Sequence, residues 1–505
     1  MPPFPLTPVL SLGERGKVSP RSKCCGVPVG RKRKAFLPLP GGEGRGEGEG
    51  APPVADRAST KLSAACKKVR SAQALSAAGF ALAGGRGRAY TGRVKVPGPL
   101  LPLLLCAGVV APGVGHAQVD PEKRQLFQLG YNQALQGLGP LAAYAYYYLN
   151  VPDWPRAGQT LRLAVAPVYL DAELAFREAL GPQTHLALGA AGGGFADSHL
   201  EVRGGRFLKE QSFNGHGGEL SASVYHLFNP GARIPLNGVA RAVWHHTEFE
   251  RSDRTGPGFA LPPDTGSLRP RVGLRWGGRE PLLTPRVAME LSAWYEGDFR
   301  FNSGAFGLAG DRQLESRSHL FWARALLAYT LPEREDYFSV NVTTGTSFGA
   351  DRFSGYRLGA ALPLAGEFPL SLPGYYFQEI TARQFMLVGG LYTLPLDARK
   401  RWNVTGFAAT AVVEYVSGMA QPGDWHTGVG GGVGYTSADK VWEVTVGYAY
   451  GVDAMRSNGR GAHSVGLVAQ YDLEARRTRA KTPPPEVDPL KSRGLQRLFR
   501  GVFGN

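Results

Sequence analysis

Apolar and polar residues alternate along most of this chain after residue 118. In the run 443–450, Val444, Val446, Tyr448 and Tyr450 occupy every second position. Successive side chains of a β-strand point to opposite faces, so these four residues would share one face of a strand. Long stretches with the 3.6-residue helical period are missing from the same region. The sequence therefore predicts an all-β fold whose strands each have one apolar face.

The alternating segments follow one another with short connections, as in an up-and-down meander. Fourteen of them are clear, and faint candidates could raise the number to sixteen. The expected strands lie near 143–150, 160–175, 184–196, 217–228, 237–250, 268–277, 286–300, 317–331, 336–348, 381–396, 402–417, 425–437, 440–452 and 462–473.

A soluble sandwich and a transmembrane barrel could both use such strands. A sandwich buries the apolar face between two sheets, whereas a barrel turns it toward lipid and keeps a polar lumen. The expected inner faces carry charge at Glu290, Arg324, Glu414 and Glu443, and many of the strands are ten to sixteen residues long. Aromatic residues gather at strand ends, namely Tyr329, Tyr392, Tyr415, Tyr435, Tyr450 and Tyr471. These features favour a closed antiparallel transmembrane β-barrel of 14–16 strands.

The segment 93–117 has the pattern of a cleaved signal peptide. Arg93 and Lys95 form a basic start, the apolar run 100–110 follows, and small residues precede a cleavage site after Ala117. The apolar run is too short for a membrane-spanning helix. All four cysteines lie within the first 106 residues, so a chain that begins at Gln118 contains none. This pattern predicts export from a bacterial cytoplasm.

The basic excess of the chain lies at its two ends, in 1–117 and 474–505, while 118–473 is nearly neutral. This distribution argues against nucleic-acid binding. Residues 1–92 include a Gly/Glu-rich low-complexity run at 41–50, and we expect a disordered extension that results from a start codon assigned too early.

The domain organisation expected from these patterns is linear. A periplasmic N-terminal segment, 118–142, would precede the barrel at 143–473, and a basic tail would follow at 474–505. The end of that tail has the spacing of a short amphipathic helix, which could touch the inner membrane leaflet, plug the lumen or remain mobile.

One long loop interrupts the meander after residue 348. It begins with Gly349 and Ala350, and its central motif is Arg352, Phe353, Ser354, Gly355, Tyr356 and Arg357. A loop packed inside a barrel needs glycines for tight turns and a charge-assisted hydrogen bond to hold it. We expect the segment 352–378 to fold into the lumen, with Arg352 or Arg357 paired to Glu414. A solvated surface loop is the alternative.

The region 336–473 resembles the BamA/TamA superfamily, the bacterial surface antigens. Phe353-Ser354-Gly355-Tyr356 lies where that family has a Val-Arg-Gly-Phe/Tyr tip, and five expected strands follow the loop. The segments 413–418, 428–434 and 441–448 resemble the family's acidic strand end, glycine-rich strand and penultimate strand. The resemblance implies a sixteen-stranded outer-membrane barrel with an inward-folded loop.

This sequence also departs from the family pattern. Ser354 stands where the family has its tip arginine. Too few residues separate Gln118 from the first expected strand for periplasmic POTRA repeats. We therefore expect a barrel-only relative.

Three other motifs could carry chemistry. His245-His246-Thr247-Glu248 places only two possible metal ligands on one strand face, and zinc needs more. Ser223 with His226, or His463 with Ser464, could form a hydrolase pair. The glycine-rich run 189–194 lacks the Lys-Ser/Thr of a phosphate loop. We expect no metal, no cofactor and no catalytic residue.

The sequence thus predicts a non-enzymatic outer-membrane protein with a role in transport, assembly or surface display. A lipid-acting hydrolase and a simple porin-like channel are the alternatives. The expected partners are outer-membrane lipid and the barrel assembly machinery, because the segment 464–471 approximates an insertion signal. The sequence indicates no cargo.

Overall fold

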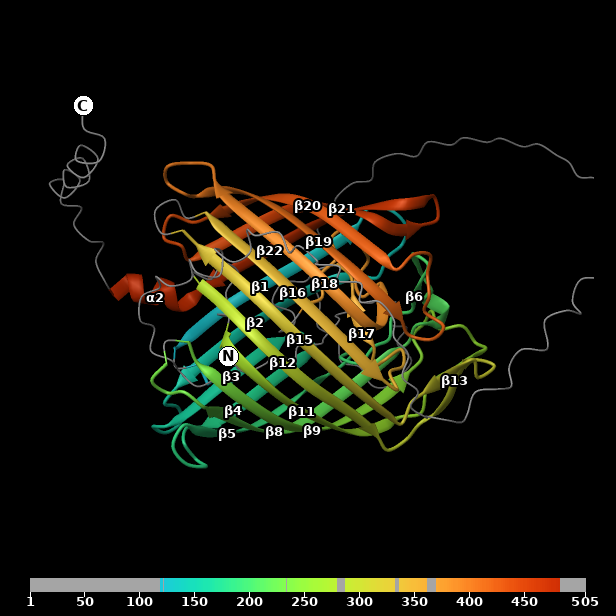
Figure 1. Cartoon of the computed structure of the whole chain (residues 1–505), viewed down its shortest axis with the longest axis horizontal. Coiled ribbons are helices and arrows are strands. Elements are labelled where there is room, and N and C mark those ends of the chain that lie inside the picture. The colour runs from blue at the N-terminus through green and yellow to red at the C-terminus, as the bar shows by residue number, and fades with distance from the viewer. Residues whose placement is uncertain are drawn as a thin grey trace, which may run out of the picture. The chain divides into compact units, whose positions relative to one another are not determined.

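The computed structural model describes residues 119–120, 122–232, 234–278, 287–331, 336–360 and 369–481. The predicted N-terminal extension 1–92, the predicted signal peptide 93–117 and most of the tail lie outside these residues. The described chain forms one sheet of 17 strands, sixteen of which close into an antiparallel barrel (Figure 1). The predicted all-β barrel of 14–16 strands is confirmed. In this part of the chain, no helix has the length and apolar composition needed to cross a bilayer.

The barrel strands are neighbours in chain order. They are β1 (Arg124–Ala134), β2 (Ala142–Pro152), β3 (Gln159–Ala166), β4 (Tyr169–Phe176), β5 (Thr184–Gly193), β8 (Asn214–Leu227), β9 (Leu236–Glu250), β11 (Thr265–Gly278), β12 (Val287–Arg300), β15 (Arg317–Thr330), β16 (Tyr337–Phe348), β18 (Ile380–Pro395), β19 (Trp402–Tyr415), β20 (Trp425–Thr436), β21 (Trp442–Arg456) and β22 (Gly459–Asp472).

The barrel closes because β1 pairs with both β2 and β22. The closing register runs from Leu126 opposite Asp472 to Ala134 opposite Ser464. Closure leaves neither the first nor the last strand with an unpaired edge. The barrel therefore begins with β1, and the prediction that the segment 118–142 is periplasmic is wrong for the residues of this strand. The predicted long strand 160–175 is in fact the hairpin of β3 and β4, and these two differences raise fourteen strands to sixteen.

The two faces of the wall differ in polarity, as β11 shows. Its outward residues Leu268, Val272 and Leu274 are 44–52% exposed, whereas the inward residues Ser267 and Arg275 are buried. Outward apolar residues suit a lipid environment and inward polar residues suit a filled lumen. The expected inward positions of Glu290 and Arg324 are confirmed, since both side chains are buried.

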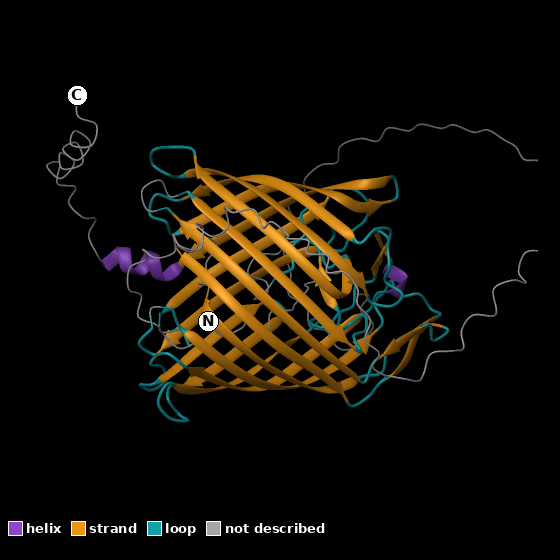
Figure 2. Ribbon diagram, in the orientation of Figure 1, coloured by secondary structure: helices purple, strands orange, loops and turns teal. Residues whose placement is uncertain are grey.

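The two ends of the barrel carry different connections. At the terminal rim, where β1 begins and β22 ends, the turns are short, and α2 (Leu473–Lys481) follows β22. At the opposite end, the loop rim, four connections contain additional short elements. Figure 2 shows short strands and a short helix at this end. These elements are β6 (Val202–Arg203), β7 (Arg206–Phe207), η2 (Lys209–Gln211), β10 (Phe259–Ala260), β13 (Gly304–Leu308), β14 (Arg312–Leu314) and β17 (Tyr356–Leu358).

The connection 349–379, here called the lumen loop, enters the barrel from the loop rim. Its strand β17 pairs with the first residues of β18. Tyr356, Leu358, Leu372 and Tyr375 are buried in one cluster with inward wall residues such as Trp322. The predicted inward-folded loop is thereby confirmed for 349–360 and 369–379. A solvated surface loop does not fit this packing.

Glycines of the wall and of the lumen loop allow the two to approach closely. A Cβ added to Gly428 of β20 would lie 2.1 Å from the carbonyl oxygen of Pro373. A Cβ on Gly374, where φ is +84°, would lie 1.9 Å from the backbone nitrogen of Gly451. The second half of the loop therefore packs on the backbone of β20 and β21 at positions where a side chain has no room.

We predict that Gly428→Ala destabilises the barrel by about 1–3 kcal/mol, because the new methyl group must displace the loop from the wall. Gly406→Ala on β19 is the matched control, since a Cβ there meets nothing within 4 Å. The midpoint of urea unfolding in detergent measures both changes. Equal midpoints for the two variants would contradict the close contact.

Candidate functional site

A fully buried carboxylate, Glu201, joins the loops that cover the loop rim. Glu201 lies in the β5–β8 connection, and its side chain has 0% exposure. Arg352 of the lumen loop donates a hydrogen bond to Oε1. Arg312 of β14 lies 3.5 Å from Oε2, and Nε of Arg203 lies 3.3 Å from Oε1. One negative charge thus holds cations from three separate connections.

His199 completes the surroundings of this carboxylate. Its Nε2 lies 2.9 Å from Oε2 of Glu201, and Nη2 of Arg357 lies 3.4 Å from its Nδ1. Because an arginine can only donate, this geometry leaves Nε2 to carry the proton toward Glu201. Arg357 also donates to the carbonyl oxygen of Arg352, which ties the two ends of the loop tip together.

Electrostatics favours the ionised form of Glu201. Burial by itself raises the pKa of this carboxyl, but the hydrogen bond with His199 and the charges of Arg352 and Arg312 outweigh burial and lower the pKa to about 2. Burial lowers the pKa of His199 below its ordinary value, despite the bond to Glu201. At neutral pH we therefore expect an anionic Glu201 beside a neutral His199.

Asp351 fixes the start of the loop tip. Its Oδ1 accepts the backbone N–H groups of Phe353 and Ser354, both at 2.9 Å, and the hydroxyl of Ser354. Its Oδ2 lies 2.5 Å from Nη1 of Arg300 at the end of β12. Burial opposes ionisation, but the charge of Arg300 and these hydrogen bonds lower the pKa of Asp351. Asp351 therefore orders the turn and also anchors it to the wall.

Phe353 places the loop tip among aromatic side chains from the other loops. Its ring centroid is 4.9 Å from that of His199 and 5.6 Å from that of Phe306. Phe213, Phe259 and Leu314 are buried in the same cluster. The loop rim is thus covered by an apolar layer lying against the Glu201 charge cluster.

The remaining motif residues serve packing. A Cβ on Gly355 would lie 2.8 Å from Cγ2 of Val416, so only glycine fits this position without displacement. The hydroxyl of Tyr356 lies 3.0 Å from two backbone carbonyl oxygens of the wall, those of Phe321 and Thr346, and can donate its one proton to either. All six predicted motif residues therefore lie at or inside the barrel mouth.

The expected partner Glu414 is not part of this arrangement. Glu414 pairs with Arg383, and both side chains are about half exposed. Val413 points inward and is buried, so its neighbour Glu414 points outward. A register shift between Ala382 and Gln384 also turns Arg383 to the outer face. The prediction of an Arg352–Glu414 pair is corrected by the Arg352–Glu201 contact.

A second buried ion pair holds the other half of the lumen loop. Nη1 of Arg456 on β21 lies 2.8 Å from Oε1 of Glu379, and both side chains are at most 1% exposed. The guanidinium of Arg456 also lies 3.6 Å from the ring centroid of Tyr376. Burial raises the pKa of Glu379, and Arg456 offsets only part of this effect. The loop is therefore fastened at both of its ends.

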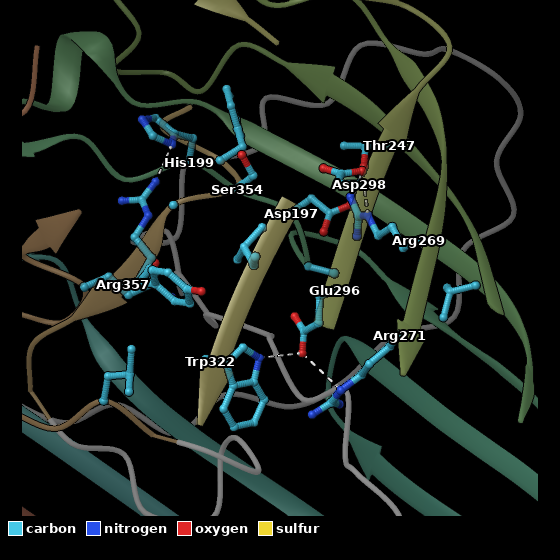
Figure 3. A pocket seen from close by; sticks show the side chains of 18 of the residues that line it. Asp197, His199, Thr247, Arg269, Arg271, Glu296, Asp298, Trp322, Ser354 and Arg357 are labelled. Carbon is cyan, nitrogen blue, oxygen red and sulfur yellow. Dashed lines mark hydrogen bonds and ion pairs between the residues drawn. The ribbon is translucent and has the colours of Figure 1, made fainter. Parts of the chain in front are cut away.

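A cavity of about 620 Å³ remains between the lumen loop, the β5–β8 connection and the inner wall. Arginines of β11 face acids of β12 there: Arg269 lies 3.3 Å from Asp298, and Arg271 lies 3.0 Å from Glu296. Figure 3 shows Glu296 between Trp322 and Arg271. Charges of both signs therefore line the space together with aromatic and aliphatic side chains such as Trp322 and Phe353.

The other candidate motifs do not converge on a reaction centre. His245 points inward to Asp197, at 2.7 Å, while His246 stacks on outward Trp244. Within the described residues, no group of three His, Cys, Asp or Glu side chains could hold a metal ion. Ser223 is buried and His226 bonds to Thr184 at 2.8 Å. His463 bonds to Tyr448, whereas its neighbour Ser464 is buried.

The glycine-rich run 189–194 has a packing role. A Cβ on Gly193 would lie 1.9 Å from the carbonyl oxygen of Val168, in the short connection between β3 and β4. This contact explains a glycine at 193 without any phosphate ligand.

Comparison with known proteins gives structural matches only. No protein-family profile matches the sequence, and the search of curated proteins returned no match. CdiB from Acinetobacter baumannii has a TM-score of 0.47 and 9% identity over 70% of this chain and 60% of its own. BamA from Haemophilus ducreyi lacking POTRA domains 1–3 has a TM-score of 0.46 and 8% identity over 69% of this chain and 71% of its own. OprB from Pseudomonas putida has a TM-score of 0.38 and 11% identity over 70% of this chain and 94% of its own.

This chain spans about 60% of that CdiB chain. At such identities and TM-scores, the matches carry no argument about function. The barrel itself, with sixteen strands and an inward loop, has the architecture that the BamA/TamA resemblance implied. The described residues contain no POTRA repeat, which departs from the family pattern.

We predict that Arg352→Ala lowers the free energy of unfolding by about 3–5 kcal/mol, because it leaves Glu201 buried with one fewer cation. Arg383→Ala removes an equivalent but half-exposed pair and should cost no more than about 1 kcal/mol. Urea unfolding in detergent compares the two variants. A loss for Arg383→Ala as large as that for Arg352→Ala would contradict the assignment.

The mouth should also loosen in acid. The pKa of Glu201 is lowered from 4.5 to about 2, so its stabilisation is complete above 4.5 and declines as the pH falls toward 2. The lowered pKa values of Asp351 and His199 act in the same direction. Limited proteolysis of the loop should therefore speed up between about pH 5 and about pH 3, and less so in Glu201→Gln. A wild-type cleavage rate that does not change over this range would refute the prediction.

Proposed function

We propose that this chain is an outer-membrane barrel of the BamA/TamA-like type whose lumen is closed in its resting state. The observation that carries the proposal is the Glu201 charge cluster, which joins the lumen loop to the connections that cover the mouth. Movement of the lumen loop opens such a barrel, and the opened barrel serves transport, assembly or surface display. No feature of the described residues identifies a cargo.

The outer face and the rims support the membrane location. Apolar residues face outward, short turns occupy one rim and long loops the other, as in bacterial outer-membrane barrels. By this comparison the terminal rim faces the periplasm and the loop rim faces outward. Outer-membrane lipid and the barrel assembly machinery are then the expected partners, and a signal peptide at 93–117 would provide export.

Two features favour a gated barrel over the alternatives. The lumen loop packs against the wall with buried side chains, which does not suit an open porin-like channel. In the described residues, the histidine and serine pairs that a hydrolase would need point to different surroundings. We therefore propose a non-enzymatic role.

Single-channel recording tests this proposal. The full chain in a planar bilayer should show a low conductance, and deletion of 352–378 should raise it several-fold, because the loop occupies the lumen. Arg352→Ala, which keeps the loop but loosens its anchor, should produce transient openings to the same level.

Arg383→Ala provides the control, because its side chain lies on the outer face away from the lumen. It should leave conductance at the wild-type level. If the deletion and Arg352→Ala both conduct like the wild type, the loop does not close the barrel and the proposed gating is wrong.

A further inference from the structure

A row of aromatic side chains surrounds part of the terminal rim on the outer face. Its members face one another on neighbouring strands, because the register of the sheet places aromatic residues opposite each other. The row comprises Tyr329, Phe338 and Tyr392, then Trp402 and Tyr435, then Trp442, Tyr471, Phe127 and Tyr147. Aromatic girdles of this kind mark the depth of the lipid headgroups.

Beyond this row, the turns of one sector are rich in basic residues. The β18–β19 turn contains Arg399, Lys400 and Arg401, and the β20–β21 turn contains Lys440. Arg399 and Lys440 are exposed. The two turns are close on the rim, because β18 to β21 are consecutive strands of the sheet.

The acids of the same turns are engaged by the backbone. Oδ1 of Asp397 accepts the N–H groups of Arg401 and Trp402, both at 2.8 Å. Oδ1 of Asp439 accepts the hydroxyl of Ser437 and lies 3.2 Å from the backbone nitrogen of Val441. These carboxylates therefore shape the turns. By number, basic residues exceed acids in the β18–β19 turn and equal them in the β20–β21 turn.

The helix α2 continues this sector past β22. Asp472 caps its first turn by accepting the N–H groups of Glu474 and Ala475 at 3.0 and 2.9 Å. The helix contains four basic residues and one acidic residue. Nη1 of Arg476 donates to the hydroxyl of Tyr471, a member of the aromatic row, at 2.9 Å. This bond holds the start of α2 at headgroup depth, where phosphate groups lie.

Two turns further along the same rim, past β1, have balanced charge. In the β2–β3 and β4–β5 turns, Asp153 pairs with Arg177 at 3.4 Å, and Arg156 and Glu178 balance each other in number. The excess of positive charge in the β18–β19 turn and in α2 is thus not shared by the β2–β3 and β4–β5 turns.

We propose that this sector, comprising the β18–β19 turn, the β20–β21 turn and α2, binds the phosphate groups of anionic phospholipids in the adjoining leaflet. Aromatic rings fix the depth of the basic residues, and the charge excess selects negative headgroups over zwitterionic ones. The inference rests on the proposed membrane location but not on the gating role of the lumen loop.

The test uses the full chain in nanodiscs made of equal amounts of phosphatidylethanolamine and phosphatidylglycerol. After partial delipidation, native mass spectrometry counts the lipids that stay bound. The wild type should retain phosphatidylglycerol preferentially, and the combined variant R399Q/K440Q/R476Q/R477Q should lower that preference at least about tenfold. The preference should also fall in about 1 M salt, because exposed charges are screened.

The matched control is R156Q/R177Q, which removes two basic residues from the balanced part of the same rim and should keep the preference. The proposal is overturned if the wild type shows no preference, if its preference does not respond to salt, if the combined variant keeps the preference, or if both variants lose it equally. The salt titration uses the wild type alone, so a preference that does not respond to salt overturns the proposal even if the combined variant fails to fold.

Discussion

The arrangement of the barrel mouth depends on one requirement, that the charge of Glu201 be neutralised without water. A carboxylate at 0% exposure is unfavourable unless cations and hydrogen bonds surround it. Here the cations come from the lumen loop, from β14 and from the β5–β8 connection itself. Segments far apart in the sequence are therefore held together because one charge must be compensated. The aromatic layer around Phe353 packs against this charge cluster.

Much of the architecture could be predicted from the sequence because it depends on local periodicity. Alternation in β21 or β12 indicates a strand without any knowledge of its neighbours. β1 was missed because its apolar residues are sparse: Gln125, Gln128 and Asn132 interrupt the pattern. β3 and β4 were merged because the connection between them, Pro167-Val168, has only two residues and lacks the Asn-Gly type of pair that indicates a hairpin. Pro167 was a strand-breaking signal that went unused.

For the site, the sequence predicted that a charged residue holds the lumen loop, but not which residue it is. The motif around Arg352 indicated a charged anchor for an inward loop, and Asp351, a common first residue of turns, offered a signal that went unused. Glu201 offered none, because 151 residues separate it from Arg352. The choice of Glu414 followed from its place at a strand end, but a single position decides whether a strand residue faces inward or outward.

Closure of the barrel has a consequence for how the chain folds. The side chains of Gln128 and Gln470 hydrogen-bond across the junction of β1 and β22, although 342 residues separate them. The second edge of β1 therefore cannot be paired until β22 is in place. Contacts at such sequence separation form late and slowly, because the intervening chain has to be ordered first. Until the junction forms, both terminal strands are open templates for pairing, and a newly made chain is vulnerable to aggregation for that whole interval.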